Sequence, residues 1–142
     1  MSQSKNYCTF YLAEHFLAVD VEEVQEISRH FEVTPVPLSP VMLRGLINLR
    51  GQIIPSIDLR HRLDCETTEE TREANVVLRG NGSPVSLLVD DIGDIVELDL
   101  DELEPPPETL QGPVRDLVRG AFKFENRLLI LIDSSKLLRE LS

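Results

Sequence analysis

The stretch from Leu46 to Arg60, LINLRGQIIPSIDLR, limits the fold more strongly than any other part of this 142-residue chain. Apolar and polar residues alternate in it with a period of two, which is typical of β-strands that bury one face and makes a helix the poorer fit. We therefore expect two strands, each held by burial of its apolar side chains at about 25 cal/mol per Å². The residues expected to be buried are Ile47, Leu49, Ile53, Ile57 and Leu59.

Three residues inside this stretch carry further information. Gly51 interrupts the apolar set and predicts a tight structural turn or a bulge, because glycine adopts backbone angles that other residues avoid. Pro55 has no backbone N–H, so its strand must lie at a sheet edge or be locally unpaired there. Arg50, directly before the glycine, is then held on a rigid rim, where its guanidinium can bond a carboxylate or backbone carbonyls.

The rest of the chain contains further short strands. Runs of β-branched and aromatic residues separated by turn residues predict three hairpins, the last of which turns at Glu125-Asn126. Residues 21–27 fit a single helical turn and an irregular strand equally well. The strands expected in the hairpins are 7–12 with 16–19, 76–78 with 85–89, and a third pair that ends in 128–132.

Prolines and acidic residues mark the connections between these strands. TPVPLSP (34–40) and EPPPET (104–109) predict extended loops, because repeated prolines exclude both a helix interior and a central strand. Residues 64–74 form an acidic connector. Ser39 and Pro40 suit the N-cap and the first position of a short helical turn.

The last residues, DSSKLLREL, predict a short helix with Asp133 as its N-cap and with Leu137, Leu138 and Leu141 on one apolar face. Many short strands and little helix predict a β-sandwich or small β-barrels. An Arg-Gly pair recurs four times, but no internal repeat is strong enough to be assigned. The four pairs begin at Arg44, Arg50, Arg79 and Arg119.

The composition excludes several classes of function. Fourteen basic and 25 acidic residues give a net charge of −11, which opposes binding to nucleic-acid phosphates or to anionic lipid. The two cysteines, Cys8 and Cys65, form no disulfide framework. The N-terminus has no apolar run that suits a signal peptide or a membrane span. We therefore expect a reduced, cytoplasmic protein without direct membrane insertion.

No catalytic or metal-binding motif stands out. His15 and His30 have no partner at zinc-ligand spacing, whereas Asp58, His61 and Cys65 would share one face if they lay on a helix. An exposed polar turn after a strand explains these three residues better. The carboxylates of residues 90–102 alternate with apolar residues like a strand edge, unlike a calcium loop. We expect no metal, no cofactor and no catalytic residue.

Several motifs together resemble one family. GLINLRGQIIPSIDLR looks like the signature of the CheW family of chemotaxis coupling proteins. FLAVDVEEVQEI, VTPVP, VSLLVDDIGDI and RLLILIDSSKLL resemble the surrounding parts of that family, in the same order. The resemblance covers nearly the whole chain, and the motifs are specific in combination.

The resemblance implies a fold and a function. It implies one domain, 1–142, made of two intertwined five-stranded SH3-like β-barrels packed side by side, with short helices that include one at the C-terminus. It also implies a non-enzymatic scaffold that couples the cytoplasmic tip of methyl-accepting chemoreceptors to the regulatory domain of the histidine kinase CheA. That kinase domain has a similar fold, and the scaffold is recruited to membrane receptor arrays.

The resemblance also assigns a receptor-binding groove, position by position. Glu26 matches the family's partner of Arg50, so the two form the expected supporting ion pair. An alternative role for Arg50 is purely that of a strut between the barrels. The valines of the groove fit equally well as core residues, and its glycine as a backbone requirement. The full groove consists of Val24, Gly45, Arg50, Val76, Val77 and Ile95.

Other functions remain open at this point. The chain fits a coupling protein of a chemosensory pathway that controls something other than motility, because the contacts would be the same. It also fits a generic small-barrel module that binds peptides. An enzyme built on Asp58, His61 and Cys65 is a third class, which stoichiometric zinc in the purified protein would support.

Overall fold

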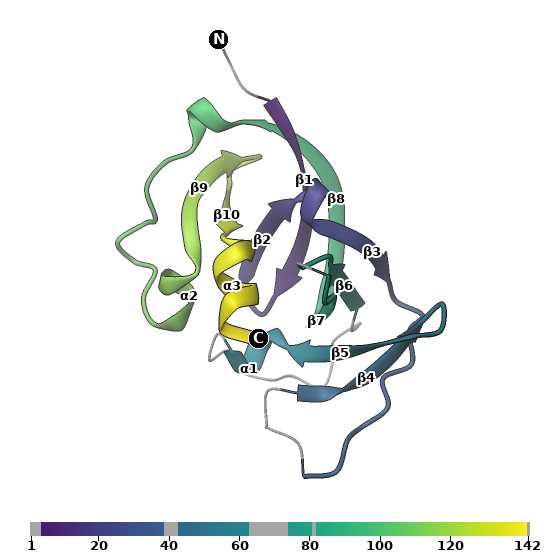
Figure 1. Cartoon of the computed structure of the whole chain (residues 1–142). Coiled ribbons are helices and arrows are strands. Elements are labelled where there is room, and N and C mark those ends of the chain that lie inside the picture. The colour runs from purple at the N-terminus through teal and green to yellow at the C-terminus, as the bar shows by residue number, and fades with distance from the viewer. Residues whose placement is uncertain (1–3, 39–42, 63–73, 81, 142) are drawn as a thin grey trace.

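Two five-stranded β-sheets form the body of the computed structural model (Figure 1). The structure describes residues 4–38, 43–62, 74–80 and 82–141, with only the backbone described at 61, 62, 113, 140 and 141. Sheet A has the strand order β8-β1-β2-β10-β9, and sheet B has the order β3-β6-β7-β5-β4. The strands are β1 (Ser4–Leu12), β2 (His15–Asp20), β3 (Val24–Ser28), β4 (Leu43–Leu49), β5 (Gln52–Asp58), β6 (Ala74–Leu78), β7 (Val85–Val89), β8 (Asp91–Asp99), β9 (Val118–Phe124) and β10 (Arg127–Ile132).

Helices are few and short. They are the 3₁₀ turns η1 (Val21–Glu23) and η2 (Leu100–Glu102) and the α-helices α1 (Leu59–Arg62), α2 (Pro113–Asp116) and α3 (Ser134–Leu141). Both expectations for residues 21–27 are met in succession, because η1 runs directly into β3. Asp133 caps α3 as expected: its Oδ1 accepts a hydrogen bond from the Lys136 N–H at 3.1 Å. Leu137 on this helix is fully buried. Over the described residues, no helix is long and apolar enough to cross a membrane.

The helical turn predicted to begin at Ser39 and Pro40 lies partly within the described residues. Ser39 and Pro40 themselves lie outside the described residues, as do positions 64–73 of the acidic connector. From Leu43 onward the chain is strand β4 rather than a helical turn.

Burial in the β4–β5 hairpin corrects one expectation. Ile47 and Leu49 are buried as predicted, but Ile53 is 59% exposed and Ile54 is buried instead. Arg50 and Gly51 form a two-residue turn with φ of 52° and 88°. Ile47 therefore pairs with Ile54 across the ladder, so the buried position next to the turn is 54 and not 53. Further along the chain, Ile57 and Leu59 are buried as predicted.

Pro55 also lies differently from one of the two expectations. Its strand, β5, is internal to sheet B, between β7 and β4, so the edge position is wrong. Pro55 is paired with Leu46 in the ladder, but no backbone hydrogen bond joins these two residues. Its partner Leu46 exchanges both backbone hydrogen bonds with Thr34, and the parallel ladder with β7 begins one residue later, at Ser56. No ladder bond therefore requires the missing N–H.

The sheets are not closed barrels, which corrects the predicted fold. Over the described residues, one backbone bridge links the two edges of each sheet. In each case, a residue that follows one edge strand pairs with a residue of the other edge strand. Thr34, after β3, pairs with Leu46 on β4, and Glu104, after β8, pairs with Ala121 on β9. A single bridge does not extend the ladder, so each sheet curls strongly but stays open.

A glycine permits each of these bridges. A Cβ at Gly45 would lie 2.3 Å from the Thr34 carbonyl oxygen, and one at Gly120 would lie 2.4 Å from the Glu104 carbonyl oxygen. Ordinary side chains therefore cannot occupy either position without moving the bridging backbone. The two close approaches explain two of the four Arg-Gly pairs in the sequence, those at Arg44 and Arg119.

The matching bridges belong to an internal repeat that the sequence did not reveal. Both sheets contain two adjacent antiparallel hairpins joined by a parallel pair, β2 with β10 and β5 with β7. Gly45 pairs with Ser56 and Gly120 with Leu131, so the β4–β5 and β9–β10 hairpins share one register. The halves exchange strands: β1 and β2 pair with β8 to β10, while β3 to β5 pair with β6 and β7.

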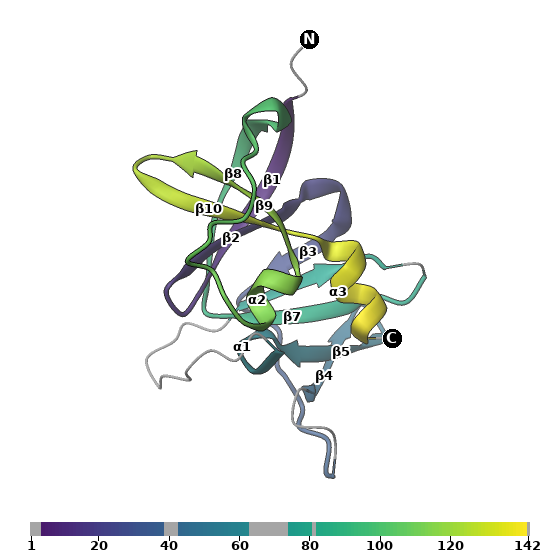
Figure 2. The same ribbon diagram turned by 90° about the vertical axis from the view of Figure 1, so that its left-hand side faces the viewer.

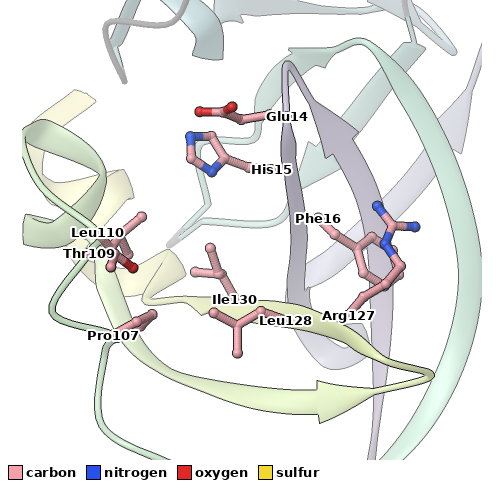
Figure 3. Close-up of a pocket in the computed structure, with 9 residues that line it drawn as sticks. All are labelled: Glu14, His15, Phe16, Pro107, Thr109, Leu110, Arg127, Leu128 and Ile130. Atoms are coloured by element: carbon pink, nitrogen blue, oxygen red, sulfur yellow. The ribbon is translucent and has the colours of Figure 1, made fainter.

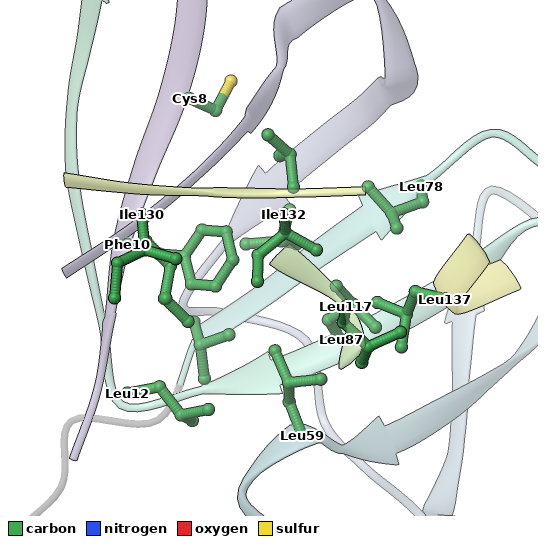
Figure 4. Packing of buried hydrophobic residues seen from close by; sticks show 14 of the residues in the cluster. Cys8, Phe10, Leu12, Leu59, Leu78, Leu87, Leu117, Ile130, Ile132 and Leu137 are labelled. Atoms are coloured by element: carbon green, nitrogen blue, oxygen red, sulfur yellow. The ribbon is translucent and has the colours of Figure 1, made fainter. Parts of the chain in front are cut away.

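Three apolar clusters hold this arrangement together. The largest lies between the sheets and combines residues of both with α3 (Figure 4). Sheet A is placed beside sheet B with α3 at their junction, as two views at right angles show (Figures 1 and 2). Each sheet also has one smaller apolar cluster on its concave side. The cluster of sheet A contains Tyr7 and Phe122, and that of sheet B contains Ile47 and Ile54.

We expect Gly45→Ala and Gly120→Ala each to lower the free energy of unfolding by about 1–3 kcal/mol, as an overpacked position does. Urea denaturation monitored by circular dichroism measures the change. Lys123→Ala, on the exposed face of β9, is the control and should change it little. Glycine variants as stable as this control would contradict the close approach at the bridges.

Candidate functional site

The turn between β4 and β5 presents the most exposed charged pair of the predicted site. The Arg50 side chain is 76% exposed, and its guanidinium nitrogen Nη1 lies 3.5 Å from Glu26 Oε2. Asn48 fixes the turn, because its Oδ1 accepts a hydrogen bond from the Gly51 N–H at 2.8 Å. The predicted pair therefore forms, and Gly51 occupies the predicted tight turn.

Glu26 is the more enclosed member of this pair. It lies on β3 opposite Val77, directly after a bulge that begins at Val24. Its Oε2 is buried and accepts no hydrogen bond from the described residues. The 3.5 Å contact with Arg50 is longer than a charge-assisted hydrogen bond. The carboxylate thus keeps an unfilled acceptor beside an exposed cation.

The remaining residues of the predicted groove divide into exposed and buried ones. Ile95 on β8 is 61% exposed and is the apolar member available to a partner. Val24, Val76 and Val77 are buried in the apolar clusters, so they support the surface from behind. Gly45 is buried at the Thr34 bridge, where its role is to permit the close approach.

The alternative site at Asp58, His61 and Cys65 is only partly described. The Cys65 position and the His61 side chain lie outside the described residues. Asp58 forms an ion pair with Arg44 at 3.3 Å and accepts a hydrogen bond from the Arg60 N–H at 3.1 Å. Within the described part of the chain, no three His, Cys, Asp or Glu side chains are placed to share a metal ion.

Two ion pairs that the sequence did not indicate tie the sheets together. Arg60, buried on α1, lies 2.5 Å from Asp90, where the chain crosses from β7 to β8. Asp90 also accepts a hydrogen bond from the Ala13 N–H at 2.6 Å in the β1–β2 turn. Arg29, after β3, pairs with Asp91 at the start of β8. These pairs join residues distant in sequence, and only the three-dimensional structure identifies them.

Two hollows occupy equivalent places on the two sheets. One is a pocket of about 470 Å³ beside the β9–β10 turn, where Arg127 lies 4.5 Å from the ring centre of Phe16 (Figure 3). The other is a pocket of about 830 Å³ lined in part by Ile53, Pro55 and Leu138. The repeat places Ile53 where sheet A has Leu128, and both side chains are exposed.

Burial also governs the two titratable core residues. It raises the pKa of the Cys8 thiol, and the nearby Asp20 carboxylate raises it further. The pKa of Tyr7 is raised by burial and by Asp20, against a smaller opposite effect of Arg119. Cys8 is therefore a protonated, buried thiol at neutral pH, which suits a core residue and not a nucleophile.

Known proteins are similar to this chain in sequence and in architecture. The profile of the CheW-like domain family matches residues 6–142. The chemotaxis protein CheW of Bacillus subtilis is 35% identical, in a match that covers 85% of this chain and 78% of that protein. The probable chemotaxis protein CheW of Rhizobium etli is 32% identical, with 92% and 85% covered.

A solved structure extends the similarity to three dimensions. The scaffolding protein TtCheW from Thermoanaerobacter tengcongensis superposes with a TM-score of 0.80 at 29% identity, and the match covers 92% of this chain and 89% of that one. The sequence motifs, the two five-stranded sheets and the similarity to these relatives all indicate the same family. The chain belongs to the family of CheW-like proteins.

Proposed function

We propose that this chain is a non-enzymatic adaptor that couples chemoreceptors to a CheA-type histidine kinase in chemosensory signalling. The observation that carries the proposal is the exposed Arg50 on a rigid turn, beside the unfilled acceptor of Glu26. Membership of the CheW-like family supports it, as does the similarity to TtCheW, which is named a scaffolding protein.

The receptor face, in this proposal, centres on the Arg50–Glu26 pair. The guanidinium can donate to a carboxylate or to the carbonyls at a helical receptor tip, and Glu26 Oε2 can accept a donor from it. Ile95 adds an apolar contact, while Val24, Val76 and Val77 keep the surface rigid from the core. Gly45 contributes through the backbone bridge that shapes β4.

In this proposal the kinase binds a second surface, part of which lies next to the Arg50 turn on β5. Ile53 and Leu128 are exposed apolar residues at equivalent positions of the two sheets, each beside a hollow. A regulatory domain of similar fold would bury such residues against its own strands. We propose that these two hollows are where the kinase docks, and that residues 1–142 act as one unit recruited from the cytoplasm to receptor arrays.

We expect Arg50→Ala to weaken receptor binding more than kinase binding. The fold should survive, because a largely exposed ion pair contributes only about 0–1 kcal/mol to stability. Pull-down with a receptor cytoplasmic fragment, titration calorimetry with the kinase regulatory domain and thermal melts measure the three properties. Arg119→Ala, an exposed arginine on β9, is the matched control.

A double variant with both charges reversed distinguishes a direct role of Arg50 in receptor binding from a purely structural role. Arg50→Glu combined with Glu26→Arg should recover any lost stability but not receptor binding, if the guanidinium itself meets the receptor. Recovery of both properties would show that Arg50 is only a strut. Unchanged receptor binding by Arg50→Ala would place the receptor face elsewhere.

We expect the isolated kinase regulatory domain to bind this protein without receptor, with a micromolar Kd that corresponds to about −8 kcal/mol. Ile53→Asp and Leu128→Asp should each weaken this binding at least about tenfold, because a charge would be buried at the interface. Ile95→Asp serves as the control and should leave kinase binding intact. No heat of binding up to millimolar concentration would contradict the adaptor function.

A further inference from the structure

Two hairpin turns occupy equivalent places in the internal repeat. Arg50-Gly51 joins β4 to β5, and Glu125-Asn126 joins β9 to β10. Both are two-residue turns with a positive φ at each residue, 52° and 88° in the first and 49° and 63° in the second. A turn of this kind matches the twist of its flanking strands, so the backbone conformation alone does not distinguish the two turns.

A side chain holds the first turn. Asn48 Oδ1 accepts a hydrogen bond from the Gly51 N–H at 2.8 Å. The ladder of a two-residue hairpin is closed by the residues that flank the turn, so this N–H has no acceptor within the ladder. The repeat places Lys123 where sheet B has Asn48, and Lys123 forms an ion pair with Glu104 at 3.8 Å. Over the described residues, no side chain accepts a hydrogen bond from the Asn126 N–H.

Formation of the hairpin does not explain Asn48. The β9–β10 hairpin adopts the same kind of turn without such a hydrogen bond. Asparagine is also depleted in strands, and Asn48 lies exposed on the edge strand β4. Lysine, which sheet A has at the equivalent position of its own edge strand, is a common residue on such edges. The difference between the two turns is therefore related to what the first turn presents, which is Arg50.

The hydrogen bond spans the residue that carries the guanidinium. Arg50 lies between Asn48 and Gly51, and its φ of 52° is uncommon for a residue other than glycine. The Arg50 side chain is 76% exposed, and its Nη1 lies 3.5 Å from Glu26 Oε2, too far to fix its direction by a hydrogen bond. The conformation of the turn is thus the main restraint on where the guanidinium lies.

We propose that Asn48 is a positioning residue of the receptor face, which keeps the Arg50 turn in one conformation before the receptor binds. This inference rests on the proposed function, because it takes Arg50 to be the residue that meets the receptor. A guanidinium that is already placed loses less conformational entropy on binding than one carried by a mobile turn. Asn48 acts through the Gly51 N–H and does not itself contact the receptor.

NMR relaxation of the ¹⁵N-labelled full chain measures the order of the turn. We expect the Gly51 amide to have an order parameter of about 0.85 in the unaltered protein and below about 0.6 in Asn48→Ala. Asn48→Asp retains the acceptor oxygen and should keep the turn ordered. Lys123→Ala, at the equivalent position of sheet A, is the matched control and should leave the Gly51 amide unchanged.

Surface plasmon resonance with a chemoreceptor cytoplasmic fragment measures the affinity of the same proteins. We expect Asn48→Ala to weaken receptor binding about three- to tenfold, the loss that ordering one more side chain on binding causes. Asn48→Asp and Lys123→Ala should bind within about twofold of the unaltered protein. Receptor affinity should therefore follow the order of the turn from one variant to the next.

Two results would overturn the inference while Arg50→Ala still weakens receptor binding and so supports the proposed function. One is unchanged receptor affinity of Asn48→Ala, whether its turn is ordered or mobile. The other is weakened binding by either Asn48 variant with an ordered turn, which would mean that the Asn48 side chain contacts the receptor directly. Unchanged receptor affinity of Arg50→Ala would overturn both the inference and the proposed receptor face.

Discussion

The apolar cluster between the two sheets is the interaction on which the rest of the structure depends. Over the described residues, the apolar face of each five-stranded sheet packs mainly against the other sheet and against α3. Phe10 and Leu17 of sheet A meet Leu78 and Leu87 of sheet B there, and Leu137 of α3 closes one side. Because the chain crosses twice between the sheets, after β2 and after β7, each half contributes to both sides of this core. The rims of the two sheets, including the Arg50 turn, are thereby fixed relative to one another.

Polar contacts at the crossings define how the sheets meet. Asp90, at the second crossing, receives both the buried Arg60 guanidinium and the Ala13 N–H of the β1–β2 turn. Arg29 and Asp91 link the end of β3 to the start of β8. Buried ion pairs gain little net stability, because desolvation offsets their attraction. Their contribution here is geometric: they place three elements from both sheets around one carboxylate.

Local patterns in the sequence were enough to predict the hairpins, the turn at Gly51 and the Asp133 cap of α3, because turn chemistry and capping act over a few residues. Ile53 was predicted wrongly because a two-residue turn moves the buried face by one position, which the alternation alone does not show. The internal repeat could not be predicted from the sequence, because it is visible in the strand pairing and not in similar residues at equivalent positions. Ser56 and Leu131, for example, are equivalent but chemically unlike. For the candidate site, the family motifs predicted the Arg50–Glu26 ion pair, which forms, but the burial of Val76 and Val77 required the structure.

The exchange of strands has a consequence for how the chain folds as it is synthesised. All strands of sheet B lie between Val24 and Val89, whereas sheet A joins β2, near the N-terminus, to β10, near the C-terminus. Sheet B is thus able to form while the ribosome is still adding residues, but sheet A must wait for almost the whole chain. Pairing between such distant segments is slow. Until β10 pairs with β2, Phe10 and Leu17 of the β1–β2 hairpin lack some of the apolar residues that bury them in the native structure. The apolar face of the nascent hairpin is therefore open to non-native contacts until β10 has been synthesised.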